Sequence, residues 1–85
     1  MTLKEWNAVA SVIPRSEPAW PIVAYIYCYF DPARLLKDVW DMAAYEFDIT
    51  PNTVRKSIHD VCKKYGYKNL HDLMVEIFAK VSEEG

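Results

Sequence analysis

The side chains best suited to binding chemistry lie in residues 51–64, where hydrogen-bonding and cationic groups recur at helical spacing. They are Asn52, Thr53, Arg55, Lys56, His59, Lys63 and Lys64. Arginine can form a bidentate pair of hydrogen bonds with guanine, and asparagine can do so with adenine. Lysine and threonine are suited to contacts with phosphate oxygens. In a helix most of these residues oppose an apolar stripe that includes Val54, Ile58 and Cys62. The stretch predicts a helix that reads DNA with its exposed face.

Positive charge is concentrated in the same part of the chain. The whole protein has a formal net charge of −2, yet residues 50–68 carry five cations and one anion, a net charge of +4. Residues 1–49 and 69–85 each have a net charge of −3. A phosphate backbone would meet the positive segment favourably, and the acidic remainder would discourage other orientations. The alternative is that these positive charges have no ligand and only form the solvated face that any amphipathic helix has.

The candidate contacts divide by side-chain chemistry. We expect Asn52 and Arg55 to reach base edges, and His59 to contact either bases or phosphates. The expected phosphate contacts are Thr53, Lys56, Lys63 and Lys64.

A second apolar stripe precedes this stretch and predicts its partner helix. Its members, three or four residues apart, are Leu36, Val39, Trp40, Ala43, Ala44 and Phe47. Asp48 tolerates the left-handed backbone of a tight turn, Ile49 is an apolar plug, and Thr50 followed by Pro51 is an N-cap with proline at the first helical position. Residues 36–65 therefore predict a helix-turn-helix with residues 51–64 as recognition helix.

Three further helical segments are predicted from caps and breakers. A capping box formed by Thr2 and Glu5 starts a helix at Leu3, which ends before Pro14. The apolar residues 22–30 are expected to form a central helix that starts between residues 16 and 20. Residues 31 and 32, Asp-Pro, are expected to open the helix that continues through residues 36–47.

The last helix is predicted at about residues 69–83. Gly66 suits the left-handed end of the recognition helix, and Asn69 suits the next N-cap. With 85 residues, 52% hydrophobic and only two glycines, the chain predicts one all-α domain, residues 1–85. We expect a compact bundle of about five helices.

Other classes of protein find little support. Cys28 and Cys62 lie in apolar helical patterns, so no disulfide is expected. His59, Cys62 and His71 lack paired metal-ligand spacing, and neither a phosphate loop nor a nucleophile elbow occurs. We expect no metal, no cofactor and no enzymatic activity.

The aromatic residues 20–30 could form a ligand pocket or a dimer seam, but a domain this small needs them as core. Without a membrane span or signal peptide, the cytoplasm is the expected compartment.

Residues 36–62 resemble the effector domain of the sporulation master response regulators of endospore-forming bacteria. The sequence pattern of that family is an apolar helix ending in isoleucine-alanine-x-x-phenylalanine, then a polar turn, then valine-x-x-x-isoleucine on the recognition helix. The counterparts here are Ala43, Ala44, Phe47, residues 48–50, Val54 and Ile58. The resemblance implies a bacterial transcription regulator that binds double-stranded DNA, with copies paired on tandem sites through the last helix. We expect Met74 and Phe78 at that interface.

The chain also departs from this family. An arginine precedes the family's valine and glutamate-arginine follows it, whereas Thr53, Arg55 and Lys56 stand here. These substitutions predict a different operator. Because the family's receiver domain has no counterpart in the sequence, we expect either an excised or stand-alone effector domain, or a protein to which regulation by phosphorylation does not apply. The alternative from another class is a small helical adaptor that binds protein through its last helix or an acidic patch, with the helix-turn-helix as architecture only.

Overall fold

Five helices joined by turns make up residues 1–83, the part of the chain that the computed structural model describes. They are α1 (Leu3–Val12), α2 (Trp20–Cys28), α3 (Leu36–Phe47), α4 (Pro51–Tyr65) and α5 (Leu70–Glu83). No strand occurs in this part of the chain, so the predicted all-α fold class and its five helices are confirmed. Residues 84 and 85, the end of the predicted domain, lie outside the described residues.

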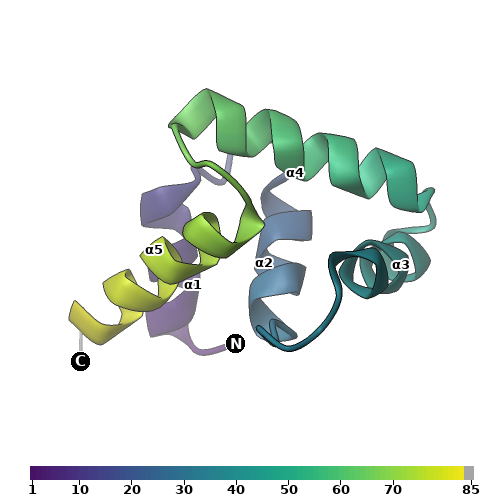
Figure 1. The fold of residues 1–85 in the computed structure, drawn as a ribbon. Coiled ribbons are helices and arrows are strands. Elements are labelled where there is room, and N and C mark those ends of the chain that lie inside the picture. The colour runs from purple at the N-terminus through teal and green to yellow at the C-terminus, as the bar shows by residue number, and fades with distance from the viewer. Residues whose placement is uncertain (84–85) are drawn as a thin grey trace.

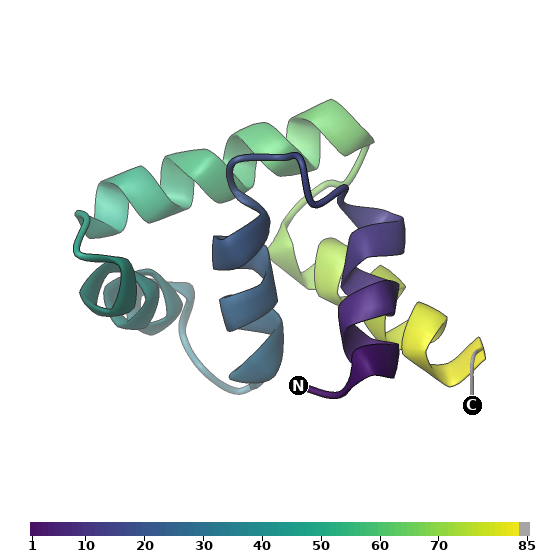
Figure 2. The same cartoon turned by 180° about the vertical axis from the view of Figure 1, so that it is seen from behind.

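α4 crosses the ends of the other helices. Figure 1 shows α2 between α3 on one side and α1 with α5 on the other, with α4 lying across the top of all of them. The view from behind, in Figure 2, shows the same arrangement, with the turn between α1 and α2 rising to meet α4. The two ends of α4 consequently have different neighbours: α3 at the first turn, and the α1–α2 turn at the last.

The core is apolar and receives side chains from all five helices. No polar or charged residue is buried among residues 1–83. The largest fully buried side chains are Ile13, Ile58, Leu73, Met74, Ile77, Val9, Val23 and Val54. Burying one such side chain stabilises a fold by roughly 1.5–3 kcal/mol. The core therefore fixes the orientation of α4 through its buried face.

The predicted helix caps are confirmed where the structure describes them. The Thr2 hydroxyl accepts from the Glu5 amide at 3.2 Å, and the Glu5 carboxylate accepts from the Thr2 amide at 3.1 Å. The side chain of Asn69 accepts from the amide of Asp72 at 2.9 Å at the start of α5. Gly66 ends α4 with φ of 84°, which an L side chain rarely adopts.

The start of α3 was predicted wrongly. The Asp31 carboxylate accepts from the amide of Ala33 at 2.9 Å, and the Asp31 carbonyl accepts from the amide of Arg34 at 3.0 Å. These bonds close a single turn, and the extended backbone of Leu35 (ψ 144°) prevents it from continuing. The helix therefore begins at Leu36.

Several residues of the predicted apolar stripes are exposed. Leu3 is 75% and Leu36 is 53% exposed, and Trp6 lies at the surface stacked on Trp20 with ring centroids 4.9 Å apart. Cys28 is exposed at the end of α2, whereas Cys62 is buried. The apolar stripes predicted which side of each helix faces the core, but not which residues at the edge of a stripe are exposed to solvent.

Candidate nucleic-acid interface

The turn of residues 48–50 fixes the direction of α4. Asp48 adopts the left-handed conformation with φ of 55°, and the Ile49 amide donates to the Ala44 carbonyl at 3.0 Å. The Thr50 hydroxyl then accepts from the Thr53 amide at 3.2 Å, and Pro51 occupies the first helical position. The predicted turn chemistry is confirmed, and it gives α4 a defined start.

Small and branched side chains hold α3 against α4. Ala43 and Ala44 are buried on α3, as are Val54 and Ile58 on α4. Alanines at such a contact let two helices approach closely. One turn further along, at the end of α3, Phe47 meets Tyr25 of α2 edge-on at 5.7 Å between ring centroids. With the buried face of α4 fixed in this way, its opposite face must point to solvent.

The outward face of α4 presents a row of polar side chains. At helical spacing, Asn52, Lys56, His59 and Lys63 lie opposite the buried stripe, and all four are exposed. Within residues 1–83, no ion pair engages Lys56, His59 or Lys63. Asp60 is exposed on the same helix and is its one anion. The row, Asn52 with Lys56, His59 and Lys63, is called the cationic row below.

Arg55 lies beside the cationic row, on the flank of α4 that faces α3. Its guanidinium donates to the Asn52 side-chain oxygen at 2.8 Å. The bond orients both predicted base-reading residues, and it uses one of the two lone pairs on the oxygen that asparagine needs for a bidentate contact with adenine. Arg55 keeps its remaining donors, and Asn52 keeps its amide donors and one lone pair.

Thr53 and Lys64 lie on the opposite flank and already have partners within the chain. The Thr53 hydroxyl is 2.7 Å from that of Thr50, inside the helix cap. The Lys64 ammonium forms an ion pair at 3.0 Å with Glu17 in the α1–α2 turn. The same Glu17 oxygen accepts from the Tyr65 hydroxyl at 2.8 Å. This group, Glu17 with Lys64 and Tyr65, is called the Glu17 clasp below.

The Glu17 clasp shifts the titration of its members. The hydrogen bond from Tyr65, followed by that from Lys64, lowers the pKa of the Glu17 carboxyl below its ordinary value. The hydrogen bond to Glu17 and the negative charge of that carboxylate raise the pKa of Lys64. This arrangement was not predicted, because Glu17 lies 47 residues before its lysine partner in the sequence. The clasp ties the last turn of α4 to the rest of the domain.

The expectation for the α5 surface needs correction. Met74 is fully buried, because the apolar stripe of α5 is centred on it and on Ile77. Met74 is therefore unavailable to a partner. Phe78 is 41% exposed and packs one side of its ring against Tyr27, at 5.1 Å between centroids. Val75, which the sequence did not single out, is 52% exposed on the same helix.

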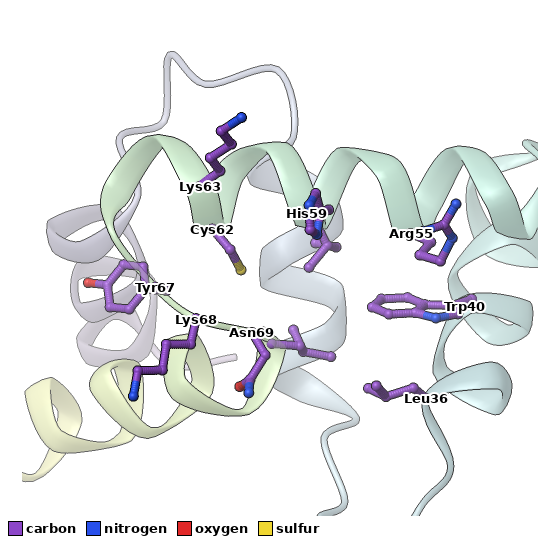
Figure 3. A pocket seen from close by; sticks show the side chains of 11 residues that line it. Leu36, Trp40, Arg55, His59, Cys62, Lys63, Tyr67, Lys68 and Asn69 are labelled. Atoms are coloured by element: carbon purple, nitrogen blue, oxygen red, sulfur yellow. The ribbon is translucent and has the colours of Figure 1, made fainter.

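A groove of about 440 Å³ runs beside α4, between the starts of α3 and α5. Its lining residues are Leu36, Trp40, Arg55, Ile58, His59, Cys62, Lys63, Tyr67, Lys68, Asn69 and Leu70. Figure 3 shows Leu36 and Trp40 reaching into it from α3, and Cys62 from α4. The sequence pointed to Arg55, His59 and Lys63 but assigned Leu36 and Trp40 to the core, so the groove itself was not predicted.

The structure also bears on metal binding and membranes. Among residues 1–83, no three histidine, cysteine or acidic side chains lie close enough to hold a metal ion. Cys62 is buried in the core, and this burial raises the pKa of its thiol, which disfavours the thiolate that binds metals. None of the helices in this part of the chain is long and apolar enough to cross a membrane.

Comparison with models of protein families, with curated proteins and with solved structures found no match to this chain.

Proposed function

We propose that the protein binds double-stranded DNA sequence-specifically, with α4 in the major groove. The observation that carries this proposal is the cationic row, which is exposed along a helix held rigidly by a helix-turn-helix. The major groove of B-DNA is wide enough to admit one α-helix, and the row and Arg55 offer donors of the kind that contact base edges and phosphates. The net charge of +4 in residues 50–68 favours this orientation over others.

Each side chain has a role in this proposal that follows from its place on α4. Arg55 forms a bidentate contact with a guanine, and Asn52 contacts an adenine through its amide group and the remaining lone pair of its oxygen. His59 contacts a base or a phosphate from the middle of the row. The phosphate contacts are Thr53 at the start of the helix, with Lys56, Lys63 and Lys64 further along.

The resemblance of residues 36–62 to the effector domain of sporulation response regulators supports a role in bacterial transcription, within the cytoplasm. It also supports pairing of two copies on tandem sites. In this structure Phe78 and Val75 are the apolar side chains of α5 available for such pairing. Because Thr53, Arg55 and Lys56 differ from the family's residues, we propose a different operator.

Selection of binding sites from randomised duplex DNA tests the proposal. We expect an enriched site whose affinity falls steeply as salt rises from 50 to 200 mM, because bound phosphates release counterions. A point change in the enriched site should weaken binding by about tenfold or more, as expected for direct readout. If no sequence is enriched and duplex DNA does not bind at low salt, the proposal is wrong.

A protein-binding adaptor is the second candidate. Two exposed apolar side chains on α5, Val75 and Phe78, favour it, together with the acidic net charge of −2. NMR shift changes confined to residues 70–81 on adding a protein partner, with none on residues 52–63 on adding DNA, would decide for the adaptor.

A further inference from the structure

The groove beside α4 has an apolar floor that is open to solvent. Trp40 is half-buried and Leu36 is 53% exposed, although both belong to the apolar stripe of α3. Figure 3 shows the Trp40 ring and the Leu36 side chain projecting from α3 toward the space under α4. Ile58 and Leu70 complete the floor from α4 and α5. The Trp40 ring and the Leu36 side chain are therefore accessible together in one concave site.

The rim of the groove is cationic. Arg55, His59, Lys63 and Lys68 contribute to the lining, and no acidic residue does. Figure 3 shows Arg55 above the Trp40 ring, whereas the Lys63 side chain rises from α4 away from the space beneath it and Lys68 lies beside the start of α5. Arg55 is therefore the cation that lies over the aromatic part of the floor. In a protein of net charge −2, this rim is a local positive field.

We propose that this groove binds a small organic anion with a flat apolar body, such as an aromatic carboxylate, sulfonate or phosphate ester. A volume of about 440 Å³ is in the range of small-molecule sites, which combine a mostly apolar lining with a few polar groups. The apolar body lies against Trp40 and Leu36, and the anionic group lies at the rim near Arg55 and His59, which are one turn apart on α4. The ligand class follows from this combination of aromatic floor and unopposed positive charge.

Occupancy of the groove regulates DNA binding, a consequence that rests on the proposed function. Arg55, His59 and Lys63 belong both to the groove lining and to the expected DNA contacts. An anion held at the rim neutralises charge that a phosphate would otherwise meet, and engages the guanidinium proposed to read guanine. The ligand and the operator therefore compete for the same side chains.

The ligand site is tested first without DNA, using naphthalene-2-sulfonate as the probe. In an NMR titration of the full chain we expect saturable shifts at Trp40, Leu70 and His59. The uncharged analogue 2-naphthalenemethanol should bind about fivefold more weakly, because it lacks the interaction with the rim. Shifts elsewhere in the molecule, no saturation, or equal binding of the two compounds would overturn the proposal.

Two adjacent leucines offer a matched pair of variants. Leu36 lines the groove and is 53% exposed, whereas Leu35 does not line it and is 70% exposed. Leu36→Glu places a carboxylate at the floor and should weaken the binding of the sulfonate probe by about tenfold or more, since apolar contact is replaced by repulsion. Leu35→Glu adds the same charge and should change binding less than about twofold. Unfolding curves of both variants verify folding, and equal effects on probe binding would overturn the proposal.

The regulatory consequence is tested on a DNA duplex that the protein binds. Naphthalene-2-sulfonate should raise the apparent Kd for DNA in wild type at concentrations near its own Kd, and should act on Leu36→Glu only at about tenfold higher concentration. Probe bound in the groove without any effect on DNA affinity would overturn the competition. If the protein binds the probe but no DNA, the proposed function fails while the ligand site stands, so the two failures are distinguishable.

Discussion

Two neighbouring lysines at the end of α4 are used in opposite ways. Lys64 forms an ion pair at 3.0 Å with Glu17 and belongs to the Glu17 clasp. Lys63, one residue earlier, is exposed at the rim of the groove and forms no ion pair with another residue of 1–83. Their identity and position in the sequence are nearly the same. The difference teaches that a local charge of +4 overstates the charge available to a ligand.

The same contrast extends along the two flanks of α4. The flank toward the α1–α2 turn is closed by the Glu17 clasp, whereas the flank toward α3 and α5 opens into the groove. Arg55 lies on the open flank, where the one hydrogen bond of its guanidinium within residues 1–83 is to Asn52 of the same helix. We therefore expect substitutions on the open side to change binding without loss of stability, and substitutions on the clasped or buried sides to lower stability.

The largest effect is expected from the buried face of α4. Ile58→Ala removes a side chain that is 2% exposed and should lower the free energy of unfolding by about 3 kcal/mol, because it leaves a cavity. The neighbouring variant His59→Ala should change it by less than about 0.5 kcal/mol. Urea unfolding followed by circular dichroism measures both. Comparable losses from the two variants would contradict the assignment of the two faces.

The next effect is expected at Arg55. Arg55→Ala should weaken binding to the selected DNA site by about tenfold or more and relax preference at one base pair, because a bidentate contact to guanine is lost. Lys4→Ala removes the same charge at the start of α1, far from α4 in Figure 1, and serves as the control. Fluorescence anisotropy with matched and mismatched duplexes provides the measurement. Equal weakening by both variants would show that only net charge matters.

The two lysines provide a smaller and more discriminating effect. Lys63→Gln should reduce DNA affinity severalfold and lower the slope of log affinity against log salt by about one, with no change in melting temperature. Lys64→Gln should lower the melting temperature, because Glu17 loses its ionic partner. Salt titrations and thermal unfolding of both variants measure the contrast. The prediction is wrong if the two variants have the same effect on the melting temperature.

Much of the fold was predictable from short stretches of sequence, because its determinants are local. The capping box at Thr2 and Glu5 and the turn at Asp48 and Thr50 depend on residues within one helical turn. The same holds for the end of α4 at Gly66, where only one backbone position requires φ above zero. Local chemistry of this kind is visible without knowledge of the tertiary structure.

The candidate site was less predictable, because it depends on contacts between distant segments. Trp40 fits the apolar stripe of α3, but its exposure depends on where α5 begins relative to α4. Lys64 fits the polar face of α4, but its partner Glu17 comes from the α1–α2 turn. Met74 was assigned to an interface because the spacing of the α5 stripe does not reveal which of its members is central. Tertiary packing decided each of these outcomes.

The smallest expected effect is the pH dependence of the Glu17 clasp. Because hydrogen bonds from Tyr65 and Lys64 lower the pKa of Glu17 below its ordinary 4.5, folding favours its carboxylate. The stabilisation is present above pH 4.5 and is lost as pH falls through the lower folded pKa. The melting temperature of Glu17→Gln should thus lie below that of wild type at pH 6, with the gap narrowing below about pH 4.5. The control Glu46→Gln, at an exposed site on α3, should show no such narrowing. A difference in melting temperature between wild type and Glu17→Gln that stays constant with pH would mean that packing and not charge holds the Glu17 clasp.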